Sequence, residues 1–184
     1  MMGKLSKILH LQGLRKKWNL YLVNKVYAGT KPKHFEKKRK LLNQIGFEIG
    51  EGTRVVGPIF CAGKLKVGKN CWIGKNLFVN GNGTVAIGDN CDIGPEVIFQ
   101  TGGHKIGGSE RRAGEGVIHN QTVGNGCWIG GRATILNSIN IGNSCVIAGC
   151  ACITKDVDNN SFVGGVPAKL IKVLENEASK YSKK

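Results

Sequence analysis

At 184 residues the chain is long enough for one domain with appendages. Its 28 glycines and four prolines make a turn-rich composition, but glycine lacks the three-residue period that would indicate collagen. The net charge of +15 is concentrated in residues 1–45, where twelve Lys and Arg face the single acid Glu36. The longest wholly apolar run in that segment is Leu20–Val23, which is far too short to span a membrane.

The basic segment 1–45 is predicted to form two helices, over about 4–27 and 32–44, with a break near Gly29 and Pro32. An apolar stripe is expected on the first helix, formed by Leu5, Ile8, Leu9, Leu14, Trp18, Tyr21 and Leu22. The pattern fits a helical cap that packs its stripe on the domain, and it also fits a basic helix in peripheral contact with an anionic membrane. No nucleic-acid partner is expected, because the sequence contains no recognition module and no interleaving of aromatic and basic residues.

From residue 49 onward, an apolar residue returns at every sixth position. The fifteen positions are Ile49, Val55, Cys61, Val67, Ile73 and Val79, then Ile87, Ile93 and Phe99, then Val123, Ile129, Ile135, Ile141, Ile147 and Ile153. Glycine follows this residue in eight hexads. A short fixed period is typical of a solenoid whose repeats stack and bury one narrow core. An amphipathic helix would instead show returns at three and four residues.

The hexads therefore predict an all-β fold, a parallel β-helix over residues 46–167. Three hexads close one triangular coil of 18 residues, which gives about five coils, with two extra residues near Val85 and Ala86. A prism this thin has flat faces and open ends that favour association with other chains. Residues 168–184 are expected to form a short C-terminal helix and tail.

Four of the seven cysteines, Cys71, Cys91, Cys127 and Cys145, occupy the fifth position of a hexad, where the turn favours a small residue that faces inward. Free cysteine behaves there as a small buried hydrophobe. The odd number of cysteines, the absence of a CxxC pair and the absence of a secretory signal indicate a reducing compartment. A cytoplasmic location is expected, and the membrane alternative for the basic segment would place the protein peripherally at the inner membrane face.

The ladder of apolar residues breaks once, between Phe99 and Val123, and then resumes in phase. A glycine-rich loop over 105–122 is predicted to leave the scaffold there, and loops on rigid scaffolds commonly carry function. His104 stands at the base of this loop. Histidine is the side chain best suited to accept a proton near neutral pH, so His104 is a candidate general base.

Four segments in this order resemble one known family. They are Thr101–His104, Val123–Gly131, Ile153–Asp156 and Gly164–Lys172. The family is the hexapeptide-repeat acetyltransferases, and the nearest subgroup is the galactoside, maltose and Nod-factor O-acetyltransferases with their polysaccharide-modifying relatives. The resemblance covers about residues 47–174. It implies a left-handed parallel β-helix, a homotrimer with active sites between neighbours, and acetyl transfer from acetyl-CoA to a hydroxyl group.

The resemblance also assigns roles to individual residues. His104 matches the general base of the family, and Asn80 matches an asparagine that contacts the acceptor. The acetyl-CoA groove is matched by Trp128, Gly131, Gly149, Thr154, Lys155 and Lys172. Three features depart from the family. The lysine-rich N-terminal segment has no match for the acidic residue that binds sugar in the galactoside enzymes, the two extra residues near Val85 lack the family's acidic pair, and no proline follows His104. These departures affect the identity of the acceptor.

The expected activity is direct transfer of acetyl from acetyl-CoA to a sugar hydroxyl, with a histidine as general base. The favoured acceptor is a cell-surface polysaccharide or its precursor. A serine- or xenobiotic-type acetyltransferase of the same fold stays open, as does a non-catalytic β-helix scaffold. A γ-type carbonic anhydrase also has this fold but needs three zinc-binding histidines. The repeat region offers only His104 and His119, so no metal is expected.

Overall fold

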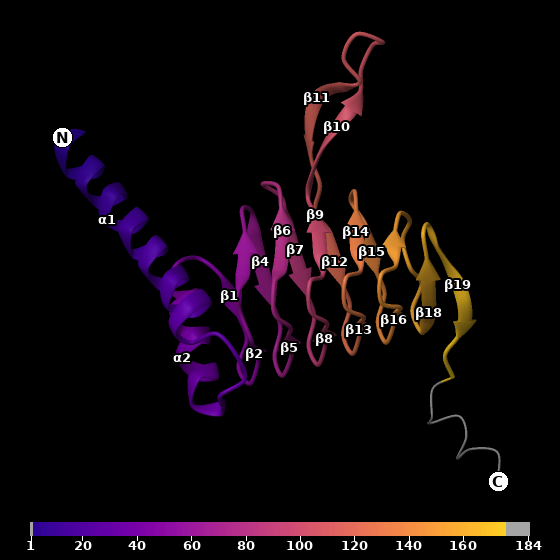
Figure 1. Cartoon of the computed structure of the whole chain (residues 1–184), viewed down its shortest axis with the longest axis horizontal. Helices are drawn as coiled ribbons and strands as arrows, with labels where there is room; N and C mark the ends of the chain where they lie inside the picture. Colours follow the sequence, from indigo (N-terminus) through magenta and orange to yellow (C-terminus); the bar gives the residue numbers. More distant parts are fainter. Residues whose placement is uncertain (1, 176–184) are drawn as a thin grey trace.

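The computed structural model describes residues 2–175. It is a prism of stacked parallel coils, with a pair of helices at its N-terminal end and one long hairpin that projects from its middle (Figure 1). Each complete coil contributes one strand to each of three sheets, which we name sheets A, B and C. The parallel β-helix predicted from the hexads is confirmed.

The strands of each sheet follow one another from coil to coil. Sheet A contains β1 (Glu48–Ile49), β4 (Lys64–Val67), β7 (Thr84–Ile87), β12 (Gln121–Val123) and β15 (Asn140–Ile141). Sheet B contains β2 (Arg54–Val55), β5 (Trp72–Ile73), β8 (Asp92–Ile93), β13 (Trp128–Ile129), β16 (Val146–Ile147), β18 (Ser161–Gly165) and β19 (Ala168–Val173). Sheet C contains β3 (Ile59–Cys61), β6 (Leu77–Asn80), β9 (Ile98–Gln100), β14 (Thr134–Leu136) and β17 (Cys152–Ile153).

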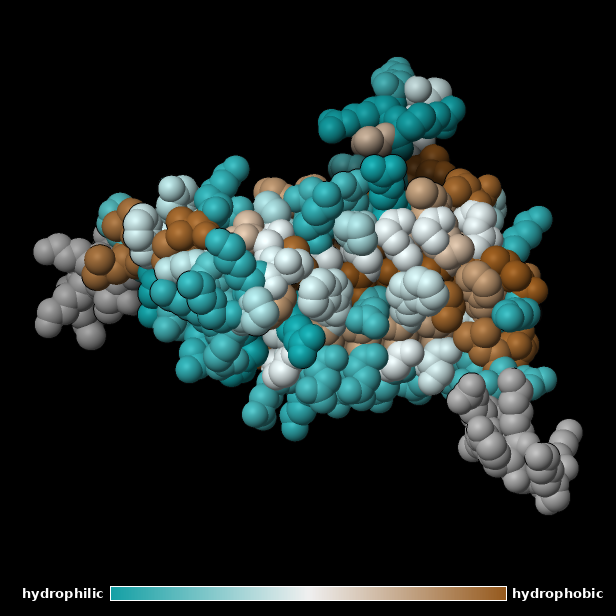
Figure 2. All heavy atoms as spheres, turned by 60° about the horizontal axis from the view of Figure 1, so that its bottom comes forward, coloured by the Kyte–Doolittle hydropathy of each residue, from teal (hydrophilic) through white to brown (hydrophobic). Residues whose placement is uncertain are grey.

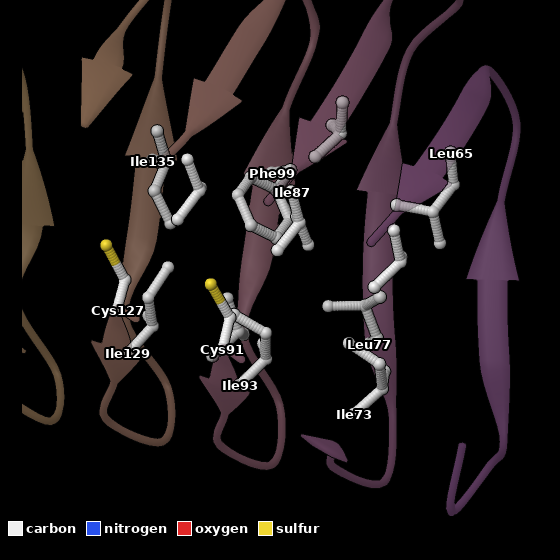
Figure 3. Close-up of a cluster of buried hydrophobic side chains, with 14 of the residues drawn as sticks. Leu65, Ile73, Leu77, Ile87, Cys91, Ile93, Phe99, Cys127, Ile129 and Ile135 are labelled. Carbon is white, nitrogen blue, oxygen red and sulfur yellow. The ribbon is translucent and has the colours of Figure 1, made fainter. Parts of the chain in front are cut away.

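The residues of the hexad ladder form the core of the prism. All fifteen are buried except Cys61, which is half-buried. In each sheet a ladder residue lies beside its counterpart in the next coil, so that Ile73 pairs with Ile93 and Ile93 with Ile129. Figure 3 shows these side chains stacked along the inside of the prism. Burial of each such side chain contributes about 1.5–3 kcal/mol, and this repeated contribution stabilises the stack.

The register of sheet A locates the two extra residues. Leu65 pairs with Val85, twenty residues further along the chain, whereas the regular spacing of a coil is eighteen. In sheet C the spacing is still regular up to Val79, which pairs with Cys61. The extra residues therefore lie in the turn between β6 and β7, over 80–83. The prediction that placed them near Val85 and Ala86 is a few residues too late, because both residues are paired within β7.

A ladder of side-chain hydrogen bonds lines the corner between sheets A and B. The thiol of Cys71 donates to the carbonyl of Gly88, and the thiol of Cys91 donates to the carbonyl of Gly124, both at 3.1 Å. The pattern continues with Cys127 and Cys145 in the following coils. A contact with Cys127 and burial raise the pKa of the Cys91 thiol to about 11, which keeps it protonated and able to donate. The cysteines are thus buried donors as well as small hydrophobes.

The N-terminal segment forms α1 (Met2–Tyr21), the π-helix η1 (Leu22–Val26) and α2 (Pro32–Asn43), close to the predicted bounds. Val23 and Leu42 are fully buried in the core that continues into the prism. The fully buried Lys38 donates from Nζ to the carbonyl of Gly29 at 2.8 Å and to that of Val56 at 3.0 Å. These contacts attach the helical segment to the first coil of the prism.

The predicted apolar stripe of the first helix does not pack on the prism. Leu14, Trp18 and Tyr21 are each at least half exposed. The helix docks instead through a different face, on which Asn19 is buried and its side-chain amide donates to the carbonyl of Leu41 at 2.9 Å. The stripe members Leu5, Ile8 and Leu9 lie where the structure does not describe side chains.

The predicted C-terminal helix is wrong over residues 168–173. This segment forms β19, which pairs antiparallel with β18. The open edge of β18 in sheet B explains the difference. Its unpaired backbone N–H and C=O groups can bond to a neighbouring strand, so the segment pairs with this edge as β19. Residues 176–184 of the predicted helix and tail lie outside the described residues. Within residues 2–175 no helix is both long and apolar enough to cross a membrane.

Candidate active site

An antiparallel hairpin leaves the corner between sheets C and A where a loop over 105–122 was predicted. The predicted bounds are about three residues too late, because the hairpin begins at Gly102 and residues 121–122 are already paired in sheet A. The strands of the hairpin are β10 (Gly102–Ile106) and β11 (Ala113–Ile118), with His104 paired to Gly116. Thr101, which is fully buried, precedes the hairpin and donates from its backbone N–H to the carbonyl of Asn80 at 2.7 Å. The backbone N–H of His119 in turn donates to the carbonyl of Thr101 at 2.8 Å. The root of the hairpin is therefore tied to the coil below.

One buried glutamine closes the gap that the hairpin leaves in the coil. Gln121 is 1% exposed, and its Nε2 lies 3.2, 3.1 and 2.7 Å from the carbonyl oxygens of Gln100, Ile135 and Asn137. Its Oε1 has no partner among the described residues. In the stack of sheet A, Gln121 pairs with Val85, and Val85 pairs with Leu65. A polar residue thus replaces an apolar one only at the root of the hairpin.

The imidazole of His104 is oriented by the hairpin itself. Its Nδ1 lies 2.9 Å from the carbonyl oxygen of Gly114, on the opposite strand. A carbonyl only accepts, so Nδ1 carries the hydrogen and donates it, which leaves the lone pair of Nε2 available. The side chain is exposed and lines a pocket of about 550 Å³. The arrangement can accept a proton from a molecule that enters this pocket.

The pocket lies at the foot of the hairpin. Its lining residues are Gly81, Asn82, Gln100, Gly102, Gly103, His104, Gly116, Val117 and Ile118. The predicted acceptor contact Asn80 is not among them, but it is exposed, directly precedes Gly81 and pairs with Gln100 in sheet C. Asn80 and His104 therefore belong to adjacent coils on the same corner of the prism.

The second histidine of the region lies apart from the first. The Nδ1 of His119 is 3.2 Å from the hydroxyl oxygen of Ser138. The Nε2 of His119 would lie 3.3 Å from a Cβ placed on Gly103. Because neighbouring residues of a strand face opposite sides, the Gly103 side of the hairpin is opposite to the His104 side. The two imidazoles therefore do not face one another.

The six residues predicted for the acetyl-CoA groove form two groups. Trp128 is exposed on sheet B, and Gly131 and Gly149 stack in the turns between sheets B and C, where Cys150 donates its N–H to the carbonyl of Gly131 at 2.9 Å. Lys172 is exposed on the outer strand β19 of sheet B, where it pairs with Phe162.

The other two residues lie on the corner that carries the hairpin. Thr154 and Lys155 follow β17 and line a separate pocket of about 200 Å³ at the C-terminal end of the prism. Lys169 of β19 lines the same pocket. Within one chain, the predicted groove residues are thus distributed over sheet B and the two corners that flank sheet C, and they are not gathered around His104.

Sequence reasoning missed Gln121, Gly114 and Lys169. Gln121 had a detectable signal, because it is a polar residue at the fifth position of a hexad, where the neighbouring coils have the apolar Val85 and Ile139. Gly114 had none, since its role depends on the register of the hairpin. Among residues 2–175, no three His, Cys, Asp or Glu side chains are grouped closely enough to hold a metal ion.

Comparisons with known proteins agree with this fold. No family model matches the sequence. The galactoside O-acetyltransferase of Escherichia coli (strain K12) is 30% identical over 152 residues, which cover 82% of this chain and 75% of the relative. A solved galactoside acetyltransferase in complex with coenzyme A is 30% identical and superposes with a TM-score of 0.70, over 93% of this chain and 84% of that chain.

A hexapeptide-repeat acetyltransferase from Vibrio cholerae, solved with acetyl coenzyme A, has a TM-score of 0.76 at 23% identity. It covers 91% of this chain and 89% of that chain. At this identity the likeness concerns the fold, which is the left-handed parallel β-helix. The galactoside O-acetyltransferase is similar enough in sequence, and over enough of both chains, to show the family as well as the fold. The chain is an acyltransferase and belongs to the hexapeptide-repeat acetyltransferase family.

Proposed function

We propose that this enzyme transfers acetyl from acetyl-CoA to a hydroxyl group of a sugar, with a cell-surface polysaccharide or its precursor as the acceptor. Family membership supports the acetyl donor, since solved relatives carry acetyl-CoA or coenzyme A. The name of the galactoside O-acetyltransferase supports a sugar hydroxyl. A single observation carries the mechanism: the 2.9 Å contact from His104 Nδ1 to the carbonyl of Gly114.

That contact suits His104 to the work of a general base. An alcohol is a weak nucleophile until its proton is removed. With Nδ1 held as a donor, Nε2 can accept the hydroxyl proton while the hydroxyl oxygen attacks the thioester carbonyl. The carbon–sulfur bond then breaks, and the proton on Nε2 passes to the departing thiolate of CoA. Acetyl moves directly to the acceptor, and no acyl-enzyme is needed.

Asn80 is proposed to contact the acceptor from the coil below the hairpin. Its side chain is exposed beside Gly81, which lines the pocket of His104. The negative oxygen of the tetrahedral intermediate needs donors that are already in place. Backbone N–H groups of the coils are the first candidates for these donors, and the Asn80 amide is the second.

The exposed position of His104 supports a large acceptor. The hairpin projects from the prism, and Ile106 and Ile118 on its strands are 89% and 64% exposed. A site of this kind leaves room for a polymer to continue beyond the reacting sugar. The expected acceptor is therefore a sugar within a chain or on a carrier, and a small free sugar should react with a higher KM.

The assembly is proposed to be a homotrimer with each site between two chains. Within one chain, Trp128 and Gly131 lie on the far side of sheet C from the hairpin corner. A neighbouring prism can present its own Trp128 edge to that corner. The outward row of sheet C supports such packing, because it contains the stacked rings of Phe60 and Phe78, whose centroids are 4.9 Å apart.

The direct test is thiol release from acetyl-CoA with a panel of sugars and polysaccharides, for the wild type and two histidine variants. His104→Ala should lower acetyl transfer by roughly 10²–10⁴-fold, the usual contribution of a positioned base. His119→Ala is the matched control, and it should change the rate far less. Both variants should keep the oligomeric state of the wild type in sedimentation.

Two results would overturn the proposal. Near-full transfer by His104→Ala to the true acceptor would remove the histidine from the mechanism. A stable monomer that is fully active at micromolar concentration would remove the shared site. If no hydroxyl compound in the panel is acetylated, the acceptor class is wrong even where the enzyme binds acetyl-CoA.

A further inference from the structure

One side of α1 carries four large apolar side chains that no other part of the described chain covers. Leu11, Leu14, Trp18 and Tyr21 are 63%, 50%, 61% and 52% exposed. Their spacing of three, four and three residues places them on one side of an α-helix, and we call them the α1 stripe. The rings of Trp18 and Tyr21 stack with centroids 5.7 Å apart. A contiguous apolar surface of this kind marks an interaction site.

The helix that carries the stripe is firmly attached to the prism. The amide of Asn24 donates to the carbonyl of Ile59 at 2.9 Å, and the Ile59 N–H donates back to Asn24 Oδ1 at 3.0 Å. Val23, the residue before Asn24, is fully buried, and Asn19 is buried at its contact with Leu41. The N-terminal part of α1 projects beyond the end of the prism that is opposite to its C-terminal end (Figure 1). The stripe is therefore presented on a fixed support.

Cationic side chains accompany the stripe. Arg15, Lys16, Lys17 and Lys25 are all exposed. The first 35 residues of the chain contain no Asp or Glu, so no acid in that range neutralises them. In the view of Figure 2, apolar surface lies directly beside hydrophilic surface at the end of the molecule that carries α1. Aromatic and aliphatic contact is thus combined with a local positive charge.

We propose that α1 lies along an anionic lipid surface, with the stripe in the boundary between headgroups and acyl chains. Trp and Tyr favour that boundary because their rings are apolar with one polar edge. Exposed Lys and Arg gain from the negative potential of the same surface. The proposal is independent of the acetyl acceptor and of the mechanism at His104.

Other occupants fit these observations less well. A second copy of α1 would bring two strongly cationic segments together, and like charges across an interface oppose association. A soluble polyanion would neutralise the charges but leave the four apolar side chains in water. An anionic bilayer is the partner that accommodates the charge and the stripe together.

The test is co-sedimentation of the full-length protein with vesicles. Phosphatidylcholine vesicles that contain phosphatidylglycerol should bind the protein, and raised salt should weaken the binding. Lys17→Glu combined with Lys25→Glu should lower the partition coefficient at least about 25-fold, because each basic charge near such a surface contributes about fivefold. Lys64→Glu combined with Lys69→Glu makes the same change in net charge on the prism, and it should lower the coefficient much less.

The stripe has its own readout. In a variant with Trp72→Phe and Trp128→Phe, Trp18 is the only tryptophan, and its fluorescence should shift to the blue on anionic vesicles. Trp18→Ser combined with Tyr21→Ser should abolish binding, whereas Val173→Ser, at a 65% exposed position of β19, should not. Absence of binding, absence of the shift, or equal losses in the two double charge variants would overturn the proposal. So would a Trp18→Ser, Tyr21→Ser variant whose only change is a smaller oligomer.

Discussion

Two corners of the same prism differ in the side chains that fill the turn of the chain. At the corner between sheets A and B, every coil repeats one device, in which a thiol or hydroxyl at the fifth hexad position donates to a carbonyl of the next coil. At the corner between sheets C and A, the corresponding positions hold the apolar Leu65, Val85 and Ile139, and the single polar exception is Gln121.

The exception coincides with the hairpin that carries His104. Where a coil is interrupted, the carbonyls around the gap lose the regular partners that stacking would provide. Gln121 supplies one amide to three of these carbonyls. The comparison indicates that the hydrogen bonds of the A–B corner stabilise the stack. The C–A corner can accept an insertion, because the Gln121 side chain forms hydrogen bonds to the backbone carbonyls around it.

The largest effect is expected on catalysis, when the polar residue of the C–A corner is replaced by an apolar one. Gln121→Leu restores an apolar residue to the stack but removes the donor to the hairpin root. A shift of about 1 Å at the reacting group can cost about 10²-fold, so kcat should fall by up to that factor. The KM for acetyl-CoA should change little, because the predicted groove residues lie elsewhere. Steady-state kinetics measure both constants.

Ile139→Leu is the matched control for this substitution, since it changes the shape of a buried residue one coil further along without a polar loss. A volume-conserving change of this kind should leave kcat near the wild-type value. A Gln121→Leu enzyme with unchanged kcat would show that the amide does not position the hairpin.

The opposite result is expected at the first corner. Cys91→Ala removes the donor to Gly124 and leaves a buried carbonyl without a partner, which costs about 1–3 kcal/mol of unfolding free energy. The rate of acetyl transfer should be unchanged at a temperature where the variant is folded. Denaturant unfolding at fixed protein concentration measures the loss.

Cys91→Ser keeps a donor at this position and should recover part of the stability. If the alanine and serine variants lose equal stability, the packing of the sulfur matters and its contact with Gly124 does not. The double readout of stability and rate separates the two corners, because Gln121→Leu and Cys91→Ala should affect mainly different quantities.

The sequence predicts the regular part of this molecule well. A residue such as Ile129 repeats its environment in every coil, so one local rule determines many contacts, and the burial of the ladder is confirmed. The position of the hairpin root could be predicted in the same way, because the rule fails between Phe99 and Val123. The placement of His104 at that root rests on the same break in the pattern.

What the sequence could not supply are contacts that occur once. The hydrogen bond from His104 Nδ1 to the carbonyl of Gly114 depends on the register of a hairpin whose strands have no period. The C-terminal strand β19 could not be predicted, because its pairing with β18 depends on the open edge of a sheet, which is a tertiary feature. The stripe of α1 was visible as a pattern, but its exposure depends on which face of the helix docks.

A smaller effect, on the pH dependence of stability, is expected at Lys38, which donates to backbone carbonyls as the buried cysteines do. Burial lowers the pKa of Lys38 to about 8. An unfolded lysine titrates near 10.4, so between these values the unfolded chain binds more protons, and stability should rise with pH from about 8 towards 10. Lys38→Met should flatten this rise. A difference between the two stability profiles that is independent of pH would contradict the assignment to Lys38.

The smallest effect is expected on acetyl-CoA binding, and it tests which of two lysines belongs to the acetyl-CoA groove. Lys155 lies on that corner, whereas Lys172 lies on sheet B, and both are exposed. If they contact CoA phosphates, Lys155→Ala and Lys172→Ala should each raise the KM for acetyl-CoA by up to about fivefold, because exposed charge pairs contribute about 0.2–1 kcal/mol. The value of kcat should not change. Lys64→Ala, an exposed lysine on sheet A, is the control. A KM that rises only for Lys155→Ala would confine the groove to the hairpin corner, and values equal to that of Lys64→Ala would remove both lysines from it.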